Sequence, residues 1–303
     1  MAGDAPDPRS FTATLGAMHM TTIAGTTVLA GIIGWPVTHS LSPAMHNAAF
    51  TALGLDMAYV PLPVAGPDVE AAVKGLRSLG FRGANVTMPH KAAVVPFLDH
   101  VAEDARLIAA VNTIVVDDGG VLRGYNTDVG GFVAALRDEV AEPLVGASAL
   151  VVGAGGVARA AVLGLLRVGV RRCTVVNRTM SRAAELVDLL QPFDEAARFE
   201  LVALDDLSAA QVRGADIVVN ASALGMDGPL KVPRVLVDNI QRDHIVYDVV
   251  YGQRPTMPLE RARATGARAI DGLAMLVWQA ALSFELWTGR AAPLEVMRSA
   301  ARR

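Results

Sequence analysis

One glycine-containing segment constrains the fold of this 303-residue chain more than any other. An apolar run at residues 150–153 leads into Gly153-x-Gly155-x-x-Ala158, and a helical pattern follows. Gly153 permits a tight turn, Gly155 lets the backbone approach a pyrophosphate, and a small residue at Ala158 allows close helix–strand packing. Free N–H groups at the start of the helix then attract phosphate. An ordinary strand-to-helix turn can match this pattern, but the flanking strand and helix favour a dinucleotide-binding segment.

The end of the next predicted strand, at residues 173–177, indicates which dinucleotide is bound. Chains that bind NAD place an acidic residue about 20 residues further on, where it holds the ribose 2′-hydroxyl. Here the strand ends in Asn177-Arg178-Thr179, and Arg182 lies one turn later. Two arginines can grip a 2′-phosphate, although solvated arginines at a helix start would look the same. We therefore predict NADP(H). The predicted cofactor-binding residues of this region are Gly153, Ala154, Gly155, Gly156, Val157, Asn177, Arg178, Thr179 and Arg182.

Strands and amphipathic helices alternate along most of the chain, which indicates an α/β fold with mostly parallel sheets. The predicted strands lie at residues 28–35, 58–64, 84–88, 150–153, 173–177, 216–220 and 245–250. The predicted helices lie at residues 43–53, 67–79, 157–168, 181–190 and 273–287. Between the two halves, residues 111–117 and 121–125 flank Asp118-Gly119-Gly120. This is a hairpin signal, and it predicts an antiparallel pair at a domain edge.

Composition excludes several other classes of protein. Hydrophobic residues make up 52% of the chain and charged residues 19%, which is typical of a folded protein with a large core. The net charge is −3 and the basic residues are scattered, so we expect neither nucleic acid nor a membrane surface as a partner. The single cysteine, Cys173, lies in an apolar run and is expected in the core.

Targeting and metal-binding patterns are also missing from the sequence. The six histidines show no metal-ligand spacing, so no metal is predicted. The N-terminal residues lack the basic and apolar regions of a signal peptide, and no apolar run is long enough to span a bilayer. We therefore expect a cytoplasmic protein. The sequence leaves the oligomeric state open, a homodimer included.

Polar residues gather where the predicted strands of the first half end, which is where α/β folds assemble ligands. The four stretches are Ser40-Leu41-Ser42-Pro43, Asn85-Val-Thr-Met-Pro-His-Lys91, Val111-Asn-Thr113 and Asn126-Thr-Asp128. Each has an ordinary explanation when it is taken alone. Ser42 could cap a helix, Lys91 could be a solvated lysine, and Asn112 and Asn126 could be turn residues.

Taken together, these stretches resemble the shikimate dehydrogenase family, from about residue 31 to about residue 287. The matching stretches are Gly34-Trp-Pro-Val-Thr-His-Ser-Leu-Ser-Pro-Ala-Met-His-Asn47, Asn85-Val-Thr-Met-Pro-His-Lys91, Ala110-Val-Asn-Thr113, Asn126-Thr-Asp128, Gly153-Ala-Gly-Gly156, Asn177-Arg-Thr179, Tyr247-Asp-Val-Val-Tyr251 and Asp271-Gly-Leu-Ala-Met-Leu276 with Gln279. Their number and order make the resemblance specific.

The resemblance implies reversible, NADPH-dependent reduction of 3-dehydroshikimate to shikimate, a step of aromatic amino-acid biosynthesis. It implies that Lys91 and Asp128 form the catalytic pair, and physical chemistry agrees, because a cationic lysine can stabilise and protonate the oxygen of a ketone that is being reduced. The implied substrate-binding residues are Ser40, Ser42, Asn85, Thr87, Asn112, Asp128, Tyr251 and Gln279. Val249 and Gly272 are implied on the cofactor side.

The same resemblance predicts two domains. Residues 1–27 would be a loose extension, and residues 28–127 with 272–303 a substrate domain, whose mostly parallel mixed sheet the C-terminal helices complete. Residues 128–271 would form a Rossmann-type NADP-binding domain. One departure from the family pattern matters: Tyr125 stands where the family usually has aspartate. Relatives that also use quinate show a similar change. A quinate/shikimate dehydrogenase and a catalytically silent metabolite-binding protein therefore remain as alternatives.

Overall fold

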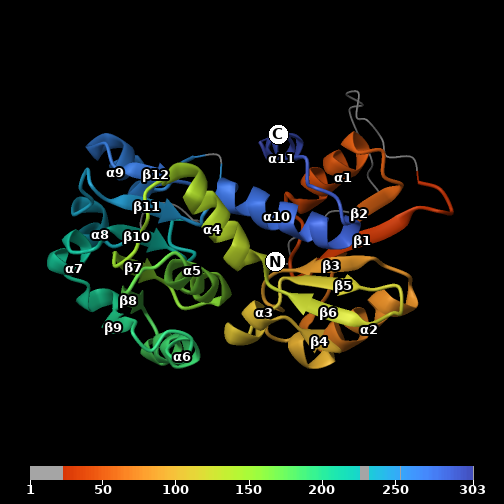
Figure 1. The fold of residues 1–303 in the computed structure, drawn as a ribbon, viewed down its shortest axis with the longest axis horizontal. Helices are drawn as coiled ribbons and strands as arrows, with labels where there is room; N and C mark the ends of the chain where they lie inside the picture. Colours follow the sequence, from red (N-terminus) through yellow and green to blue (C-terminus); the bar gives the residue numbers. More distant parts are fainter. Residues whose placement is uncertain (1–22, 226–231, 253, 303) are drawn as a thin grey trace, which may run out of the picture.

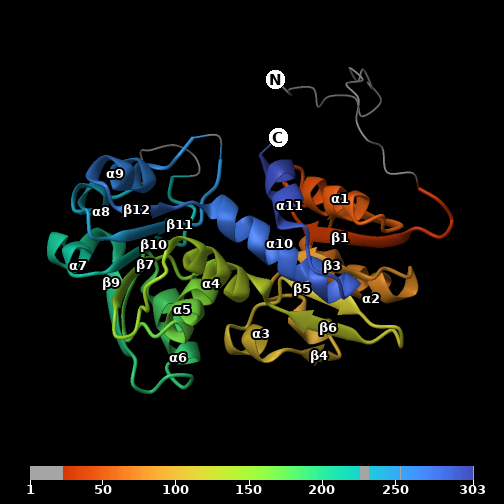
Figure 2. The ribbon, with the colours of Figure 1, turned by 45° about the horizontal axis from the view of Figure 1, so that its top comes forward.

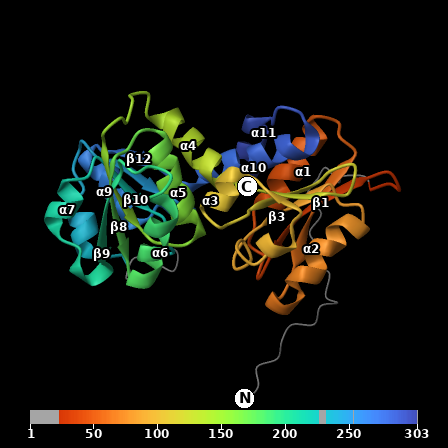
Figure 3. The ribbon, with the colours of Figure 1, turned by 60° about the horizontal axis from the view of Figure 1, so that its bottom comes forward.

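Two β-sheets lie side by side in the computed structural model, which describes residues 23–225, 232–252 and 254–302. The sheet formed by the first part of the chain and the sheet formed by the later part are separated in all three views, with helices α4 and α10 between them (Figures 1, 2 and 3). Most of the predicted N-terminal extension, residues 1–22, lies outside the described residues. No helix in the described ranges is long and apolar enough to cross a membrane.

The first sheet is mixed and has the strand order β2-β1-β3-β5-β6-β4. Only β5 runs against its neighbours, so the sheet is mostly parallel as predicted. Its strands are β1 (Val28–Gly34), β2 (Met57–Pro63), β3 (Gly83–Val86), β4 (His100–Val101), β5 (Thr113–Val116) and β6 (Leu122–Tyr125).

Helices cover both faces of this sheet because successive strand residues point to opposite sides. Ala30 packs on one side with helices α1, α10 and α11, whereas Ile33 packs on the other side with α2 and α3. The helices of this part are α1 (Ser42–Ala52), α2 (Val69–Ser78), α3 (Glu103–Leu107), α10 (Gly272–Thr288) and α11 (Leu294–Ala301), with short 3₁₀ turns at Gly66–Asp68 and Val95–Phe97.

The second sheet is fully parallel and has the strand order β12-β11-β10-β7-β8-β9. If these six strands are renumbered in the order in which they occur along the chain, their order in the sheet is that of the doubly wound dinucleotide-binding folds. The switch point of the sheet lies between β7 and β10. Its strands are β7 (Ser148–Val152), β8 (Arg172–Asn177), β9 (Arg198–Ala203), β10 (Ile217–Asn220), β11 (Ile245–Asp248) and β12 (Arg268–Ile270). Its helices are α4 (Thr127–Glu139), α5 (Gly156–Arg167), α6 (Met180–Leu190), α7 (Ala209–Arg213), α8 (Arg234–Asp238) and α9 (Met257–Thr265), with a 3₁₀ turn at Leu204–Asp206.

Two long helices carry the chain between the sheets. The chain leaves the first sheet through α4 and returns through α10, and these helices pack along each other (Figure 2). Gly131 of α4 allows this approach, because a Cβ atom there would lie 2.8 Å from the backbone nitrogen of Gln279 in α10. A further link joins α3 to α5, where Arg167 forms an ion pair with Asp104.

The strands and helices predicted from the sequence are confirmed to within a few residues, but helices α3, α4, α7, α8, α9 and α11 and three strands were not predicted. Strands β4, β9 and β12 were not predicted, and each is the outermost strand of its sheet. Edge strands are partly solvated and lack a continuous apolar run, so their sequence signal is weak. The predicted antiparallel hairpin is confirmed as β5 and β6, but it is not the edge of its sheet, because the unpredicted strand β4 pairs on the outer side of β6.

Candidate functional site

An ion pair lies where the first sheet meets α4. The Lys91 Nζ atom is 2.6 Å from the Asp128 Oδ2 atom, and these side chains are only 16% and 7% exposed. Lys91 belongs to the turn after β3, where its carbonyl accepts the N–H of Val111 at 2.8 Å. Asp128 lies in the first turn of α4, where the helix dipole favours a negative charge. The interpretation of Lys91 as a solvated lysine is therefore wrong.

The Asp128 carboxylate is held from two sides. Its Oδ1 atom accepts a hydrogen bond from Asn112 Nδ2 at 2.8 Å. The Asn126 side chain caps α4, accepting the backbone N–H groups of Asp128 at 3.0 Å and Val129 at 3.2 Å. Asn126 is therefore a helix cap, whereas Asn112 belongs to the site and is not merely a turn residue. These bonds leave Oδ2 directed at Lys91.

Three buried hydroxyls, of Thr113, Thr127 and Ser283, extend this hydrogen-bond network away from the ion pair. The Oγ1 atom of Thr113 lies 2.8 Å from the Oγ atom of Ser283, and Thr127 Oγ1 is 3.1 Å from the same Ser283 oxygen. Both threonine hydroxyls also reach Asn112 Oδ1. Ser283 was missed by the sequence interpretation. Its only signal was a small polar residue one turn after Gln279 in an otherwise apolar helix.

The Asn85 amide is buried, and protein groups are hydrogen-bonded to both its nitrogen and its oxygen. Its Nδ2 atom lies 2.9 Å from Ser283 Oγ and 3.1 Å from Thr113 Oγ1, and it reaches the Asn112 carbonyl at 3.2 Å. Its Oδ1 atom accepts the Tyr59 hydroxyl at 2.7 Å. The orientation of the Asn85 amide is therefore set by the fold.

The two predicted serines lie together at the start of α1. The Ser42 backbone N–H donates to Ser40 Oγ at 3.2 Å. Helix α1 has Leu41 at its N-cap with no side-chain cap, so the interpretation of Ser42 as a capping residue is wrong. Ser42 is buried, and its side chain lies near Tyr59, whose hydroxyl donates to Asn85.

The side chains of the other predicted substrate-binding residues lie outside this network, although the Gln279 carbonyl accepts the Ser283 hydroxyl at 3.0 Å. The Thr87 side chain packs so closely on Gly34 that a Cβ atom on Gly34 would not fit. The Gln279 side chain donates to the Leu276 carbonyl of its own helix at 2.8 Å. Tyr251 is 40% exposed, and burial of the rest of its ring raises the pKa of its hydroxyl. Among the described residues, none of these three side chains is hydrogen-bonded to Lys91 or Asp128.

The glycine motif lies at the end of β7, at the switch point of the second sheet. Gly153 has a φ of 119°, and a Cβ atom there would be 2.6 Å from the Ala221 carbonyl oxygen, so this position requires glycine. At Gly155 a Cβ atom would meet nothing within 4 Å. A Cβ atom on Gly156 would lie 3.8 Å from Lys91 Cδ. The motif therefore lies directly beside the ion pair, and the space above Gly155 suits an approaching phosphate.

The end of β8 presents positive charge and no acidic group. Asn177 donates from Nδ2 to the Thr179 carbonyl at 2.7 Å, which shapes the turn into α6. Arg178, Thr179 and Arg182 are exposed. Within the part of the chain that the structure describes, no carboxylate lies within 4 Å of either arginine. This arrangement fits a 2′-phosphate, and with the open space at Gly155 it fits NADP.

A buried polar group at the ends of β10 and β11 was also missed. Asn220 Nδ2 lies 3.0 Å from Asp248 Oδ1, and Thr256 donates to Asp248 Oδ2 at 2.6 Å. Burial raises the pKa of Asp248, although these donors oppose the rise. The group braces the segment containing Val249, against which Gly272 packs too closely for any side chain. Polar residues that end two apolar strands were the signal in the sequence.

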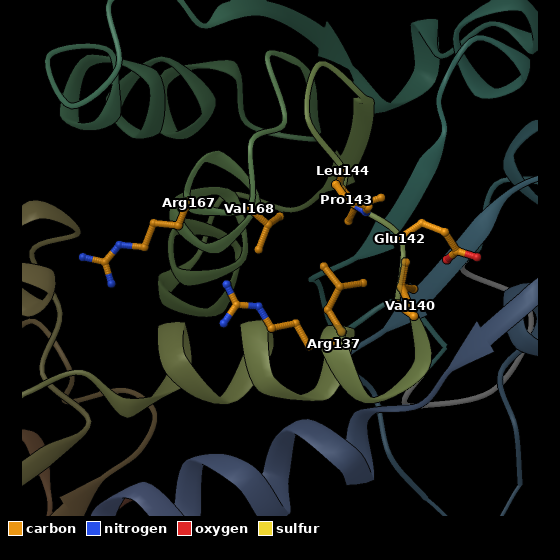
Figure 4. A pocket seen from close by; sticks show the side chains of 9 residues that line it. Arg137, Val140, Glu142, Pro143, Leu144, Arg167 and Val168 are labelled. Atoms are coloured by element: carbon orange, nitrogen blue, oxygen red, sulfur yellow. The ribbon is translucent and has the colours of Figure 1, made fainter.

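A separate hollow lies at the other ends of α4 and α5. It has a volume of about 400 Å³, and Arg137 and Arg167 stand around it (Figure 4). Asp128 and Gly156 lie at the opposite ends of these helices, so the hollow is distinct from the candidate site. In the described residues no group of three or more His, Cys, Asp or Glu side chains could hold a metal ion.

Comparison with known proteins covers nearly the whole chain. Residues 32–114 match the family model for the shikimate dehydrogenase substrate-binding domain. Residues 135–226 match the model for shikimate/quinate 5-dehydrogenase. Residues 272–302 match the model for the shikimate 5′-dehydrogenase C-terminal domain. A curated relative, the shikimate dehydrogenase (NADP+) of Desulforamulus reducens, is 44% identical over 279 residues, covering 91% of this chain and 95% of the relative.

Solved structures of similar proteins share the fold. The shikimate 5-dehydrogenase of Thermus thermophilus, in complex with NADP(H) and shikimate, has a TM-score of 0.80 and 36% identity, and the match covers 91% of this chain and 99% of that one. The quinate dehydrogenase of Corynebacterium glutamicum, in complex with NAD, has a TM-score of 0.84 and 35% identity, covering 90% and 98%. Likeness of fold at this level is therefore shared by enzymes of different substrate and cofactor preference.

Proposed function

The chain belongs to the shikimate dehydrogenase family, and we propose that it catalyses the reversible, NADPH-dependent reduction of 3-dehydroshikimate to shikimate. In this proposal residues 28–127 with 272–303 bind the substrate, and residues 128–271 bind the cofactor. One observation carries the proposal: the Lys91–Asp128 ion pair lies directly beside Gly156 of the dinucleotide motif. A proton-donating group therefore lies next to a site that fits a hydride-carrying cofactor.

The roles of the catalytic pair follow from charge. As the substrate ketone is reduced, negative charge builds on its oxygen, and the Lys91 ammonium stabilises that charge and donates the proton. Asp128 keeps the ammonium in place through its Oδ2 atom, while Asn112 holds Oδ1. In the reverse direction the neutral lysine accepts the proton of the substrate hydroxyl. Buried polar groups such as these discriminate against analogues that lack a hydroxyl, because they would be left unpaired.

The remaining roles are assigned by residue chemistry. Ser40 and Ser42 hold the substrate carboxylate. Ring hydroxyls are held by Asn85, Thr87, Asn112, Asp128 and Gln279, and Tyr251 lines the site. Bound NADP(H) supplies or accepts the hydride. The residues that hold it are the motif Gly153, Ala154, Gly155, Gly156 and Val157, the strand-end group Asn177, Arg178, Thr179 and Arg182, and the pair Val249 and Gly272.

The relatives support shikimate and NADP over quinate and NAD. The curated relative with 44% identity is named as an NADP+ enzyme of shikimate, and Arg178 and Arg182 offer charge where a 2′-phosphate is expected. Tyr125 is the reason for testing quinate as a substrate, because it replaces the aspartate that the family usually has. It is partly buried and packs against the core near α10. We also propose a cytoplasmic location. Light scattering on the purified chain would decide whether it is a homodimer.

A cofactor-absorbance assay tests this function. The assay pairs shikimate or quinate with NADP+ or NAD+, and it includes Lys91→Ala. We expect strong turnover with shikimate and NADP+, and a fall in kcat of about 10²–10⁴ in Lys91→Ala, since positioned acid–base groups contribute that much. Lys74→Ala is the matched control, because Lys74 is a 66% exposed lysine paired with Glu70 on the surface. It should leave kcat unchanged.

Other outcomes of the assay would redirect the proposal. Preferred turnover of quinate with NAD+ would assign the chain to the quinate branch of the family. Shikimate binding without turnover of any pair would support the metabolite-binding alternative. Equal losses in Lys91→Ala and Lys74→Ala would contradict the role of Lys91.

A further inference from the structure

Tyr59 is a buried tyrosine of β2 that none of the assigned roles uses. Its side chain and backbone are 2% exposed. The Asn47 side chain of α1 holds the Tyr59 backbone on both sides, accepting its N–H at 2.8 Å and donating to its carbonyl at 2.9 Å. The position of the Tyr59 ring is therefore fixed from strand and helix together.

Aromatic rings fix the direction of the Tyr59 side chain. The His46 ring stacks on it with a centroid distance of 4.4 Å and an angle of 11°, and the Trp287 ring lies 5.9 Å away. Burial among these rings lowers the pKa of His46 to about 3, and the neighbouring Asn85 side chain acts in the opposite direction. His46 is therefore neutral near pH 7 and behaves as an apolar packing partner.

The hydroxyl of Tyr59 is the donor that orients the Asn85 amide. It donates to Asn85 Oδ1 at 2.7 Å, and no other donor to that oxygen is found among the described residues. The Ser42 side chain acts on the pKa of the same hydroxyl, so a second predicted substrate-binding residue lies near it. With Oδ1 engaged, the Asn85 Nδ2 atom points at Thr113 and Ser283.

We propose that Tyr59 is a positioning residue for substrate recognition: its hydroxyl holds the Asn85 amide in the orientation that receives shikimate. This inference rests on the proposed function, because it assumes that Asn85 contacts the substrate. Tyr59 acts through Asn85 and touches no reacting atom. Its loss should therefore change substrate binding much more than the chemical step.

Tyr59→Phe tests the inference because it removes one oxygen and keeps the stacked ring. It leaves the buried Asn85 oxygen without its donor, so the amide is held only through its Nδ2 atom. We expect the KM and the Kd for shikimate to rise about tenfold, since an unpaired buried acceptor carries a penalty of that size. The value of kcat should change less than about threefold, and the KM for NADP+ should stay the same.

Tyr247→Phe is the matched control. Tyr247 is equally buried, stacks on Phe132 at 4.5 Å, and its hydroxyl has no partner among the described residues. Removing that hydroxyl should leave the KM for shikimate unchanged and should not lower the melting temperature.

A double-mutant cycle with Asn85→Ala gives the second readout. If Tyr59 acts through Asn85, then Tyr59→Phe should raise the KM for shikimate much less in the Asn85→Ala background than in the wild-type background. The melting temperature of each variant checks that it is folded. Circular dichroism at the assay temperature checks the same point.

The outcomes separate this inference from the proposed function. Wild-type protein that neither binds nor oxidises shikimate would overturn both. Wild-type protein that oxidises shikimate, with a Tyr59→Phe variant whose KM for shikimate is unchanged, would overturn the inference alone. Equal effects of Tyr59→Phe in both backgrounds would do the same, as would a fall in kcat without a change in KM.

Discussion

The two halves of the candidate site are built in opposite ways. On the substrate side, Asn112 donates to the Asp128 carboxylate and its backbone carbonyl accepts the Asn85 amide, so these buried residues hold one another. On the cofactor side, the glycine turn offers backbone and open space at Gly155, and the residues at the end of β8 are exposed. A small ring with several hydroxyls needs preset donors and acceptors, whereas a long dinucleotide is held by backbone N–H groups and surface charge. The difference matches the chemistry of the two ligands.

The largest test of this contrast uses two glycines of one turn. Gly155→Val should raise the KM for NADP+ on the order of 100-fold, because the side chain occupies the space where the pyrophosphate approaches. The free energy of unfolding should change by less than about 1 kcal/mol, since a Cβ atom at Gly155 meets nothing within 4 Å.

Gly153→Ala is the comparison for that variant. Here a Cβ atom would lie 2.6 Å from the Ala221 carbonyl oxygen at a φ of 119°. We expect a loss of about 3 kcal/mol in unfolding free energy, measured by urea denaturation. Similar unfolding free energies for the two variants would contradict this division between a ligand glycine and a packing glycine.

A second prediction sharpens the cofactor side. Arg178→Ala should raise the KM for NADP+ about tenfold and change the KM for NAD+ less than about twofold, because only NADP+ has the 2′-phosphate that the guanidinium would bind. Arg172→Ala is the control, since Arg172 lies at the opposite end of β8. If Arg178→Ala weakened both cofactors equally, the arginine would act on a group that they share.

The smallest expected effect is a change with pH in the free energy of unfolding, and it concerns His46, which is buried among aromatic rings on the substrate side. The pKa of His46 is about 3 in the folded chain and 6.5 in the unfolded chain, so only the unfolded chain takes up a proton as the pH falls below 6.5. The free energy of unfolding should therefore decrease by about 0.8 kcal/mol between pH 7.5 and pH 6.0, and continue to fall towards pH 3.

His46→Phe isolates this contribution. The variant keeps an aromatic ring against Tyr59 and has no group to titrate, so its unfolding free energy should vary less with pH. Urea denaturation of both proteins at pH 7.5, 6.0 and 5.5 gives the two slopes. Identical slopes would show that His46 does not remain neutral in the fold.

The sequence predicted the elements and the two motif regions because their signals are local. A turn such as Gly153-x-Gly155 involves residues within a few positions of each other. The α/β class and the doubly wound sheet follow from the alternation of buried strands and helices. Strands β4, β9 and β12 lack that signal, because partly solvated edge strands do not need a continuous apolar run.

The connections within the site could not be read in this way. Asn85 and Ser283 lie 198 positions apart, and nothing local to either indicates that they meet. The same holds for Tyr59 and Asn85, and for Lys91 beside Gly156. Asp248 was visible in a matching stretch, but its role in bracing the loops became clear only from its partners Asn220 and Thr256.

Local spacing along the chain thus determined which residues could form strands, turns, caps and a phosphate-binding loop. Family resemblance added which polar residues belong to one site. The tertiary structure decided which of them are held by the protein and which are open to a ligand, because burial and hydrogen-bond direction depend on packing between distant segments. Lys91 is an ordinary lysine by local pattern and a candidate proton donor by resemblance, and the structure shows that α4 brings Asp128 to within 2.6 Å of it.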